Sequence, residues 1–161
     1  MSLDKKVLDL LNKQIDIELG NAAFYRQLST VANKLGFLNT EKFLKNQYED
    51  ELTHFNKLIE YIVDRNCDPV ITQIVTPAKE AKSLEEIFTL ALKREIETTT
   101  EIKAIRQAAI NKDDQLTEVF LNSLVLEQIE EESTIYDILA MLNGLEGDKF
   151  KELLIDEKLE A

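Results

Sequence analysis

Apolar residues recur at steps of three and four along most of this chain, which is the spacing of one buried helix face. These stripes predict four long helices, at about residues 3–35, 41–65, 83–111 and 115–143, and a short one at about 148–159. Gly36 marks the end of the first helix, and Asn39 and Thr40 offer caps for the second. The segment Ser83-Leu84-Glu85-Glu86 has the form of a capping box and predicts the start of the third.

The four long helices are joined by a short, a long and a short connection. The long one, residues 66–82, holds both prolines, Pro69 and Pro77. Short links make antiparallel neighbours, whereas a long middle link lets the second pair run back along the bundle. The sequence therefore predicts an all-α fold in one domain spanning residues 1–161. In it, a four-helix bundle has one crossover between helices 2 and 3 and a short C-terminal fifth helix.

Charge and cysteine content restrict the partners of this bundle. Asp and Glu number 31 against 19 Lys and Arg, which gives a formal charge of −12. Such a surface repels nucleic acid and anionic lipid and attracts cations. Cys67 is the only cysteine, so an intrachain disulfide and a cysteine zinc cluster are excluded. No export signal and no membrane-spanning run is apparent, and we expect a soluble, cytoplasmic protein with no nucleic-acid or membrane partner.

A carboxylate interrupts each of the four apolar stripes near its midpoint. In chain order these residues are Glu18, Glu51, Glu95 and Glu131. Four carboxylates at one level of a core carry desolvation and mutual repulsion, which bound cations would offset. Glu51 and His54 lie three residues apart on one helix face and offer oxygen and nitrogen to one ion. Oxygen ligands with a single imidazole favour iron over zinc.

A plainer interpretation remains open at this point. Glutamate in a helix is commonly solvated, and shifting a stripe by one residue would move its carboxylate to the rim. The chain would then be a structural or interaction subunit with a degenerate metal centre. Interruption of all four stripes at one level, with the only histidine among them, favours the metal interpretation.

Five segments resemble the motifs of bacterial non-haem ferritins, a ferritin-like di-iron family. They are Leu11–Leu19 with Tyr25, Glu49–His54, Ala91–Glu95, Glu127–Glu132 and Leu153–Leu159. The resemblance covers nearly the whole chain. It implies an iron-storage and detoxification subunit that is also a ferroxidase, oxidising Fe(II) to Fe(III) with O₂ or H₂O₂ and storing it as a ferric mineral.

The resemblance also assigns roles to single residues. Glu18, Glu51 and His54 would hold the first iron, with Glu51 bridging to the second. Glu95 and Glu131 would hold the second iron.

Further roles follow from the same resemblance. Gln128 would orient bound water or oxygen, and Tyr25 would be a possible electron donor. The family has a third iron site on the cavity side, and its matching positions are Asp50, Glu127, Glu130 and Glu131. The family usually has Glu where this chain has Asp50, so the geometry and affinity of that third site are expected to differ.

Related families fit less well. Bacterioferritins have a second Glu-x-x-His motif and a haem-ligating Met, and rubrerythrins also need the second motif. Here His54 is the only histidine and Leu52 stands at the Met position, so no haem is expected.

Assembly is also implied by the resemblance, as a hollow homo-oligomeric shell of about 24 subunits. A DNA-protecting mini-ferritin of about 12 subunits, which usually lacks the fifth helix, is the alternative. Acidic residues at the start of the fourth helix either line an entry channel or cap the helix: Asp113, Asp114 and Glu118. Glu49 and Glu132 flank the motifs and are expected to face solvent.

Overall fold

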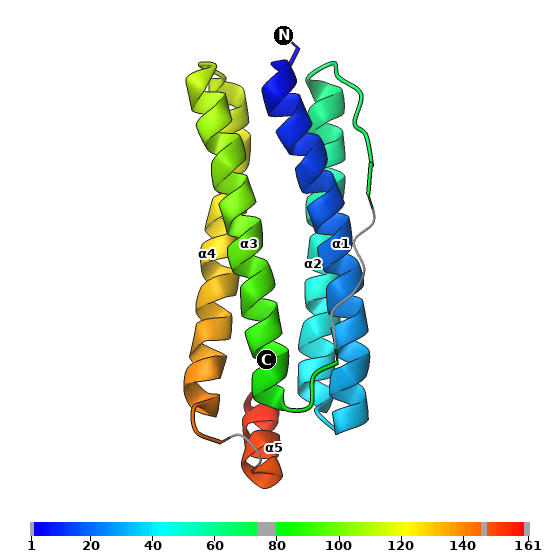
Figure 1. Ribbon diagram of the computed structural model, residues 1–161, viewed down its shortest axis with the longest axis vertical. Helices are drawn as coiled ribbons and strands as arrows, with labels where there is room; N and C mark the ends of the chain where they lie inside the picture. The colour runs from blue at the N-terminus through cyan, green and yellow to red at the C-terminus, as the bar shows by residue number, and fades with distance from the viewer. Residues whose placement is uncertain (1, 74–79, 146–147, 160–161) are drawn as a thin grey trace.

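The computed structural model describes residues 2–73, 80–145 and 148–159. Its helices are α1 (Lys5–Leu35), α2 (Leu38–Asp64), α3 (Leu84–Asn111), α4 (Gln115–Leu142) and α5 (Lys149–Lys158). The first four form a bundle in which α1 and α4 run one way and α2 and α3 the other, with α5 at one end (Figure 1). The described residues contain no strand. The predicted fold, a four-helix bundle with one crossover and a short fifth helix, is confirmed.

Most helix ends follow the local signals in the sequence. Asp4 caps α1 by accepting a hydrogen bond from the Lys6 N–H, and Gly36 ends the helix at φ 85°. Ser83 caps α3 as the capping-box pattern predicts, through the N–H of Glu86. Asp114 caps α4 in the same way.

The start of α2 differs from the prediction. The helix begins at Leu38, ahead of Asn39 and Thr40, and Phe37 at its N-cap makes no side-chain hydrogen bond. The cap comes instead from α5, because the Asp156 carboxylate accepts hydrogen bonds from the N–H groups of Asn39 (3.2 Å) and Thr40 (2.8 Å). Asn39 and Thr40 therefore do not cap α2 with their own side chains. The cap is supplied from far along the chain.

The described start of the crossover is anchored on α1. The Val70 N–H donates to Asn12 Oδ1 and the Thr72 N–H to Asp16 Oδ1, both at 2.9 Å. Asn12 and Asp16 are one helical turn apart and so lie on the same side of α1. Pro77, one of the two prolines that predicted the crossover, lies outside the described residues.

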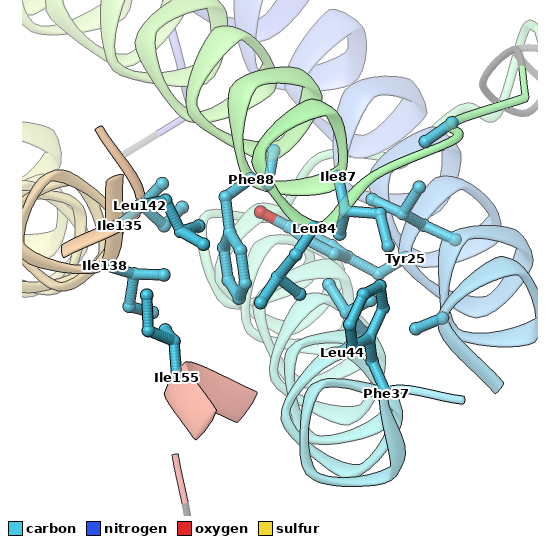
Figure 2. Packing of buried hydrophobic residues seen from close by; sticks show 14 of the residues in the cluster. Tyr25, Phe37, Leu44, Leu84, Ile87, Phe88, Ile135, Ile138, Leu142 and Ile155 are labelled. Carbon is cyan, nitrogen blue, oxygen red and sulfur yellow. The ribbon is translucent and has the colours of Figure 1, made fainter. Parts of the chain in front are cut away.

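The apolar core is divided into two clusters. One is at the α5 end and brings Ile155 of α5 to Ile138 and Leu142 of α4 (Figure 2). The other is at the opposite end, around Leu11 and Leu58. Between them every long helix contributes fully buried polar residues, namely Glu18, Asn21, Glu51, His54, Glu95, Thr98 and Gln128. The bundle thus places a polar layer across the middle of its core.

Candidate metal centre

Three predicted ligands converge in this layer. Glu18 of α1 is 1 % exposed, Glu51 of α2 is 2 % and His54 of α2 is 4 %. One potential ligand atom from each lies within 4.8 Å of the other two. His54 Nδ1 is 3.8 Å from Glu18 Oε2 and 3.7 Å from Glu51 Oε2. The antiparallel pairing of α1 and α2 and the three-residue spacing of Glu51 and His54 produce this convergence.

The inward oxygens of this trio have no protein donor. Glu18 Oε2 and Glu51 Oε2 are buried, and no hydrogen bond from the described residues reaches either of them. Buried polar atoms in folded proteins are nearly always paired, so unpaired carboxylate oxygens require another partner. Two oxygens and one imidazole nitrogen at this spacing can bind one cation.

Glu95 and Glu131 form the other half of the layer. Glu95 of α3 is fully buried and accepts hydrogen bonds from the Tyr25 hydroxyl and from Gln128 Nε2, the latter at 3.0 Å. Glu131 of α4 is half-buried, and its Oε2 has no partner among the described residues. The structure therefore brings all four seam carboxylates into one layer, but Gln128 and Tyr25 both contact Glu95 itself.

Glu18 and Glu51 shift one another's pKa values in opposite directions. Burial, together with the charge of Glu18, raises the pKa of Glu51 well above its usual range. Burial opposes ionisation of Glu18 too, but the favourable electrostatic influence of the adjacent Glu51 and His54 outweighs it and lowers the pKa of Glu18. Within this pair a proton is therefore favoured on Glu51 and a charge on Glu18.

The second carboxylate pair and the histidine are shifted as well. Burial raises the pKa of Glu131 to about 9, and the charge of Glu95 adds to the shift. Burial lowers the pKa of His54, but its attraction to the nearby Glu18 carboxylate outweighs this and raises the pKa to about 9. Burial also raises the pKa of Glu95 despite its hydrogen bonds from Tyr25 and Gln128. A cation entering this layer therefore competes with the protons that His54 and Glu131 hold at neutral pH.

A cavity of about 360 Å³ lies on the far side of His54, between α2 and α4. Its walls include all the residues predicted for a third metal site, which are Asp50, Glu127, Glu130 and Glu131. Asp50 and Glu130 are exposed, whereas Glu127 is half-buried and its Oε2 lies 2.5 Å from His54 Nε2. The cavity therefore leads from solvent to the outer edge of the histidine.

Lys57 is a wall residue of this cavity that the sequence did not single out. Its Nζ lies 3.1 Å from Glu127 Oε1, so a protein cation already contacts one of the predicted third-site carboxylates. Burial opposes ionisation of Glu127, but hydrogen bonds from Lys57 and His54 outweigh it and lower its pKa. The available signal was the position of Lys57 three residues after His54, which puts both on one face of α2.

Gln14 and Asn21 of α1 also were not singled out. Gln14 Nε2 donates to Glu18 Oε1 at 2.6 Å, and Asn21 Nδ2 lies 3.4 Å from Glu51 Oε1. Both side chains are buried. Their signal was spacing, because residues four before and three after Glu18 lie on the same helix face.

The remaining acidic candidates lie away from this layer. Asp114 caps α4 and binds Arg65 Nη1 at 3.0 Å, so it has a structural role. Asp113 and Glu49 are exposed and Glu118 is half-buried. Glu132 was expected to face solvent but is half-buried, because its Oε1 accepts a hydrogen bond from the Thr99 hydroxyl at 2.5 Å.

Comparisons with known proteins identify the family of this bundle. Residues 8–145 match the family described as Ferritin-like domain. A probable bacterial non-heme ferritin-like protein of Haemophilus influenzae is 34% identical over 157 residues, which cover 98% of this chain and 95% of the relative. A bacterial non-heme ferritin of Escherichia coli O6:H1 is 31% identical over 141 residues, covering 88% and 86%.

Solved structures give the same result. The open pore ferritin of the archaeon Archaeoglobus fulgidus superposes with a TM-score of 0.93 at 26% identity, covering 98% of both chains. Within the described part of the chain, no helix has the length and apolar character needed to cross a membrane. The resemblance that the motifs indicated is confirmed, and the chain belongs to the ferritin family.

Proposed function

We propose that this protein stores iron and oxidises it at a di-iron ferroxidase centre inside the bundle. The observation that carries the proposal is the convergence of Glu18 Oε2, Glu51 Oε2 and His54 Nδ1 on one point without a protein donor. Ferritin relatives described as non-heme support iron, without haem, as the cation. The absence of a second histidine from the chain agrees with a non-haem centre.

Ferrous iron is the substrate of this centre. Glu18, Glu51 and His54 bind the first ion, and Glu95 and Glu131 bind the second, with Glu51 bridging the two. Glu51 and Glu131, whose pKa values are raised, lose their protons as the ions enter, because the positive charge takes the place of a proton on a buried oxygen. Paired metals a few ångströms apart let one oxidant take an electron from each.

The reaction balances with either oxidant. O₂ takes two electrons from two ferrous ions and two protons from solvent to give H₂O₂, and H₂O₂ takes two of each to give two waters. In both cases the iron becomes ferric. Tyr25 donates a hydrogen bond to Glu95 and is able to supply a further electron. Gln128 holds the Glu95 carboxylate in place and is available to orient an incoming oxidant.

The cavity between α2 and α4 is the proposed exit for the ferric product. Asp50, Glu127, Glu130 and Glu131 line it and form a third, transient iron site. Asp50 is shorter than the Glu usual in the family, and Lys57 competes for Glu127, so this site holds iron weakly. Weak retention suits a step on the way to a mineral.

Storage requires a container, and we propose a homo-oligomeric shell of about 24 subunits in the cytoplasm. The close superposition on an archaeal ferritin over 98% of the chain supports this assembly. The acidic surface keeps nucleic acid away and attracts ferrous ions.

Stopped-flow mixing of ferrous iron with metal-free protein in air tests the proposal. Ferric absorbance should rise fast and saturate at about two to three ions per chain, and Glu51→Ala should abolish the fast phase. Particle mass in solution should correspond to about 24 chains. Oxidation no faster than in buffer would contradict the ferroxidase and favour a structural subunit with a degenerate centre.

A further inference from the structure

Two buried side-chain amides of α1, Gln14 and Asn21, lie beside the trio of Glu18, Glu51 and His54. Gln14 is 1 % exposed, and its Nε2 donates to Glu18 Oε1 at 2.6 Å. Only Oε1 of Glu18 is engaged in this way, while Oε2 faces His54 without a donor. The hydrogen bond therefore determines which oxygen of Glu18 is turned toward the metal position.

Asn21 contacts Glu51 in the same way, through one carboxylate oxygen. Its Nδ2 donates to the Thr98 hydroxyl at 2.9 Å and directs its second hydrogen toward Glu51 Oε1 at 3.4 Å, a long contact. Glu51 Oε2 is again left without a donor on the His54 side. Both carboxylates thus present Oε2 to the centre and Oε1 to an amide of α1.

Arg94 of α3 fixes the orientation of the Asn21 amide. Its Nη2 donates to Asn21 Oδ1 at 2.7 Å, so the amide cannot flip without losing a charge-assisted hydrogen bond. The guanidinium also lies over the Phe24 ring, 5.4 Å from its centroid. A cation on the outside of α1 and α3 is thereby connected through Asn21 to the Glu51 carboxylate.

Packing alone does not account for Gln14. Its Oε1 is buried and has no partner among the described residues, so this side chain carries an unsatisfied carbonyl in the core. Methionine has nearly the same shape and would fill the space without that cost. A residue that costs stability in the metal-free protein while contacting a ligand is expected where function selects it.

We propose that Gln14 and Asn21, with Arg94 behind Asn21, are positioning residues for the first metal-binding site. This proposal rests on the proposed function, because it requires Glu18 and Glu51 to bind a metal ion. Each amide holds one carboxylate oxygen and leaves the other free for the ion. Groups that orient metal ligands in this way raise affinity by reducing the freedom that the ligands lose on binding.

Cobalt(II) is a suitable probe, because it remains divalent in air-equilibrated buffer and its visible spectrum reports its coordination geometry. The assembled protein is titrated by calorimetry and by absorbance, and the metal-free form is melted in parallel. Gln14→Met should weaken cobalt binding about tenfold or more and change the band shape, with an unchanged or higher melting temperature. Arg94→Met should weaken binding in the same direction by a smaller factor. Lys93→Met removes an equal charge from an exposed neighbour on α3 and should match the wild type.

The outcomes separate this proposal from its alternatives. Wild-type affinity and spectrum in both Gln14→Met and Arg94→Met would overturn the positioning role. A lower melting temperature with unchanged binding would overturn it too, since that result describes a purely structural contact. If the wild type itself binds no cobalt while Lys93→Met and wild type fold alike, the metal centre is absent. The proposed function then fails together with this inference.

Discussion

Two groups of buried carboxylates in this protein have opposite surroundings. At the α5 end, Asp156 accepts hydrogen bonds from two backbone N–H groups of α2 and from the Thr40 hydroxyl. Glu152 accepts one from the N–H of Leu84, the first residue of α3. In the middle of the bundle, Glu18, Glu51 and Glu131 each keep an oxygen without any donor among the described residues.

Burial alone therefore does not identify a metal site. The carboxylates of α5 satisfy the free N–H groups of two helix N-termini and complement their dipoles, so they stabilise the fold as it stands. In the middle layer, burial and the neighbouring carboxylates raise the pKa values of Glu51 and Glu131, so these groups resist ionisation until a cation takes the place of the proton. The number of donors around a buried acid is the feature that distinguishes the two functions.

The largest effect should come from removing one of the middle carboxylates. Glu51→Gln keeps the shape of the side chain and can still donate to Glu18, but it removes the bridging ligand. We expect iron oxidation to slow by more than about 100-fold, since loss of a direct ligand exceeds the effect of losing an orienting group. The melting temperature of the metal-free protein should not fall, because the amide stays neutral beside the charged Glu18 at every pH. Oxidation at the wild-type rate in this variant would show that Glu51 is not a ligand of the centre.

Raising the pH should lower the stability of the metal-free protein and raise its affinity for metal. The pKa of His54 is raised from 6.5 to about 9. The stability that this group contributes is therefore fully present below pH 6.5 and is lost progressively as the pH rises to about 9. Glu131, whose pKa is raised from 4.5 to about 9, also favours the folded state in its protonated form, so that contribution is lost as pH rises through the same region.

Both shifts therefore predict that the metal-free protein melts at lower temperature as pH rises from about 5 to about 9. Cobalt affinity should rise over that range, by up to about a hundredfold per pH unit where two protons are displaced. Calorimetry in buffers of different ionisation enthalpy counts the released protons. Proton-independent binding would show that the shifted groups are not ligands.

At the α5 end, Asp156→Asn should lower the stability of the fold without changing metal binding. The amide leaves one oxygen to accept from the α2 N-terminus and removes the charge that complements the dipole, so we expect a loss of about 2 kcal/mol in the free energy of unfolding. Denaturant unfolding of the metal-free protein measures this loss, with the exposed Glu157→Gln on the same helix as a control. Cobalt affinity should stay at the wild-type value. A parallel loss of affinity would mean that the two regions are not independent.

The contact between Asp156 of α5 and Thr40 of α2 could not be predicted from the sequence, unlike most of the fold. The stripes, the caps at Ser83 and Gly36 and the length of the crossover are local, and from them the fold could be predicted. Glu18, Glu51 and His54 could be placed together because helix spacing assigns each to a seam. The Asp156 cap on Thr40 joins residues 116 positions apart, and no periodicity links them.

The details around the ligands were beyond prediction for the same reason. Helix spacing puts Gln14 on the same face as Glu18, but only the packed bundle determines that its amide donates to Oε1. Likewise Lys57 could be placed near His54, while its contact with Glu127 depends on how α2 meets α4. Contacts between helices depend on side-chain rotamers and packing, which a single sequence pattern does not specify.

The smallest expected effect concerns Lys57 in the cavity between α2 and α4. This cavity has one carboxylate that is paired and one that is not. Glu127 there is partly exposed and already paired with a protein cation, unlike Glu131 beside it. Ion pairs of this exposure contribute at most about 1 kcal/mol, so Lys57→Met should strengthen the third, weakest metal site about fivefold. The two inner sites should be unchanged, because Lys57 contacts none of their inward oxygens. Lys45→Met, an exposed change elsewhere on α2, controls for net charge. Calorimetric titration with cobalt resolves the third site from the others, and an unaltered third affinity would show that Lys57 does not compete with metal for Glu127.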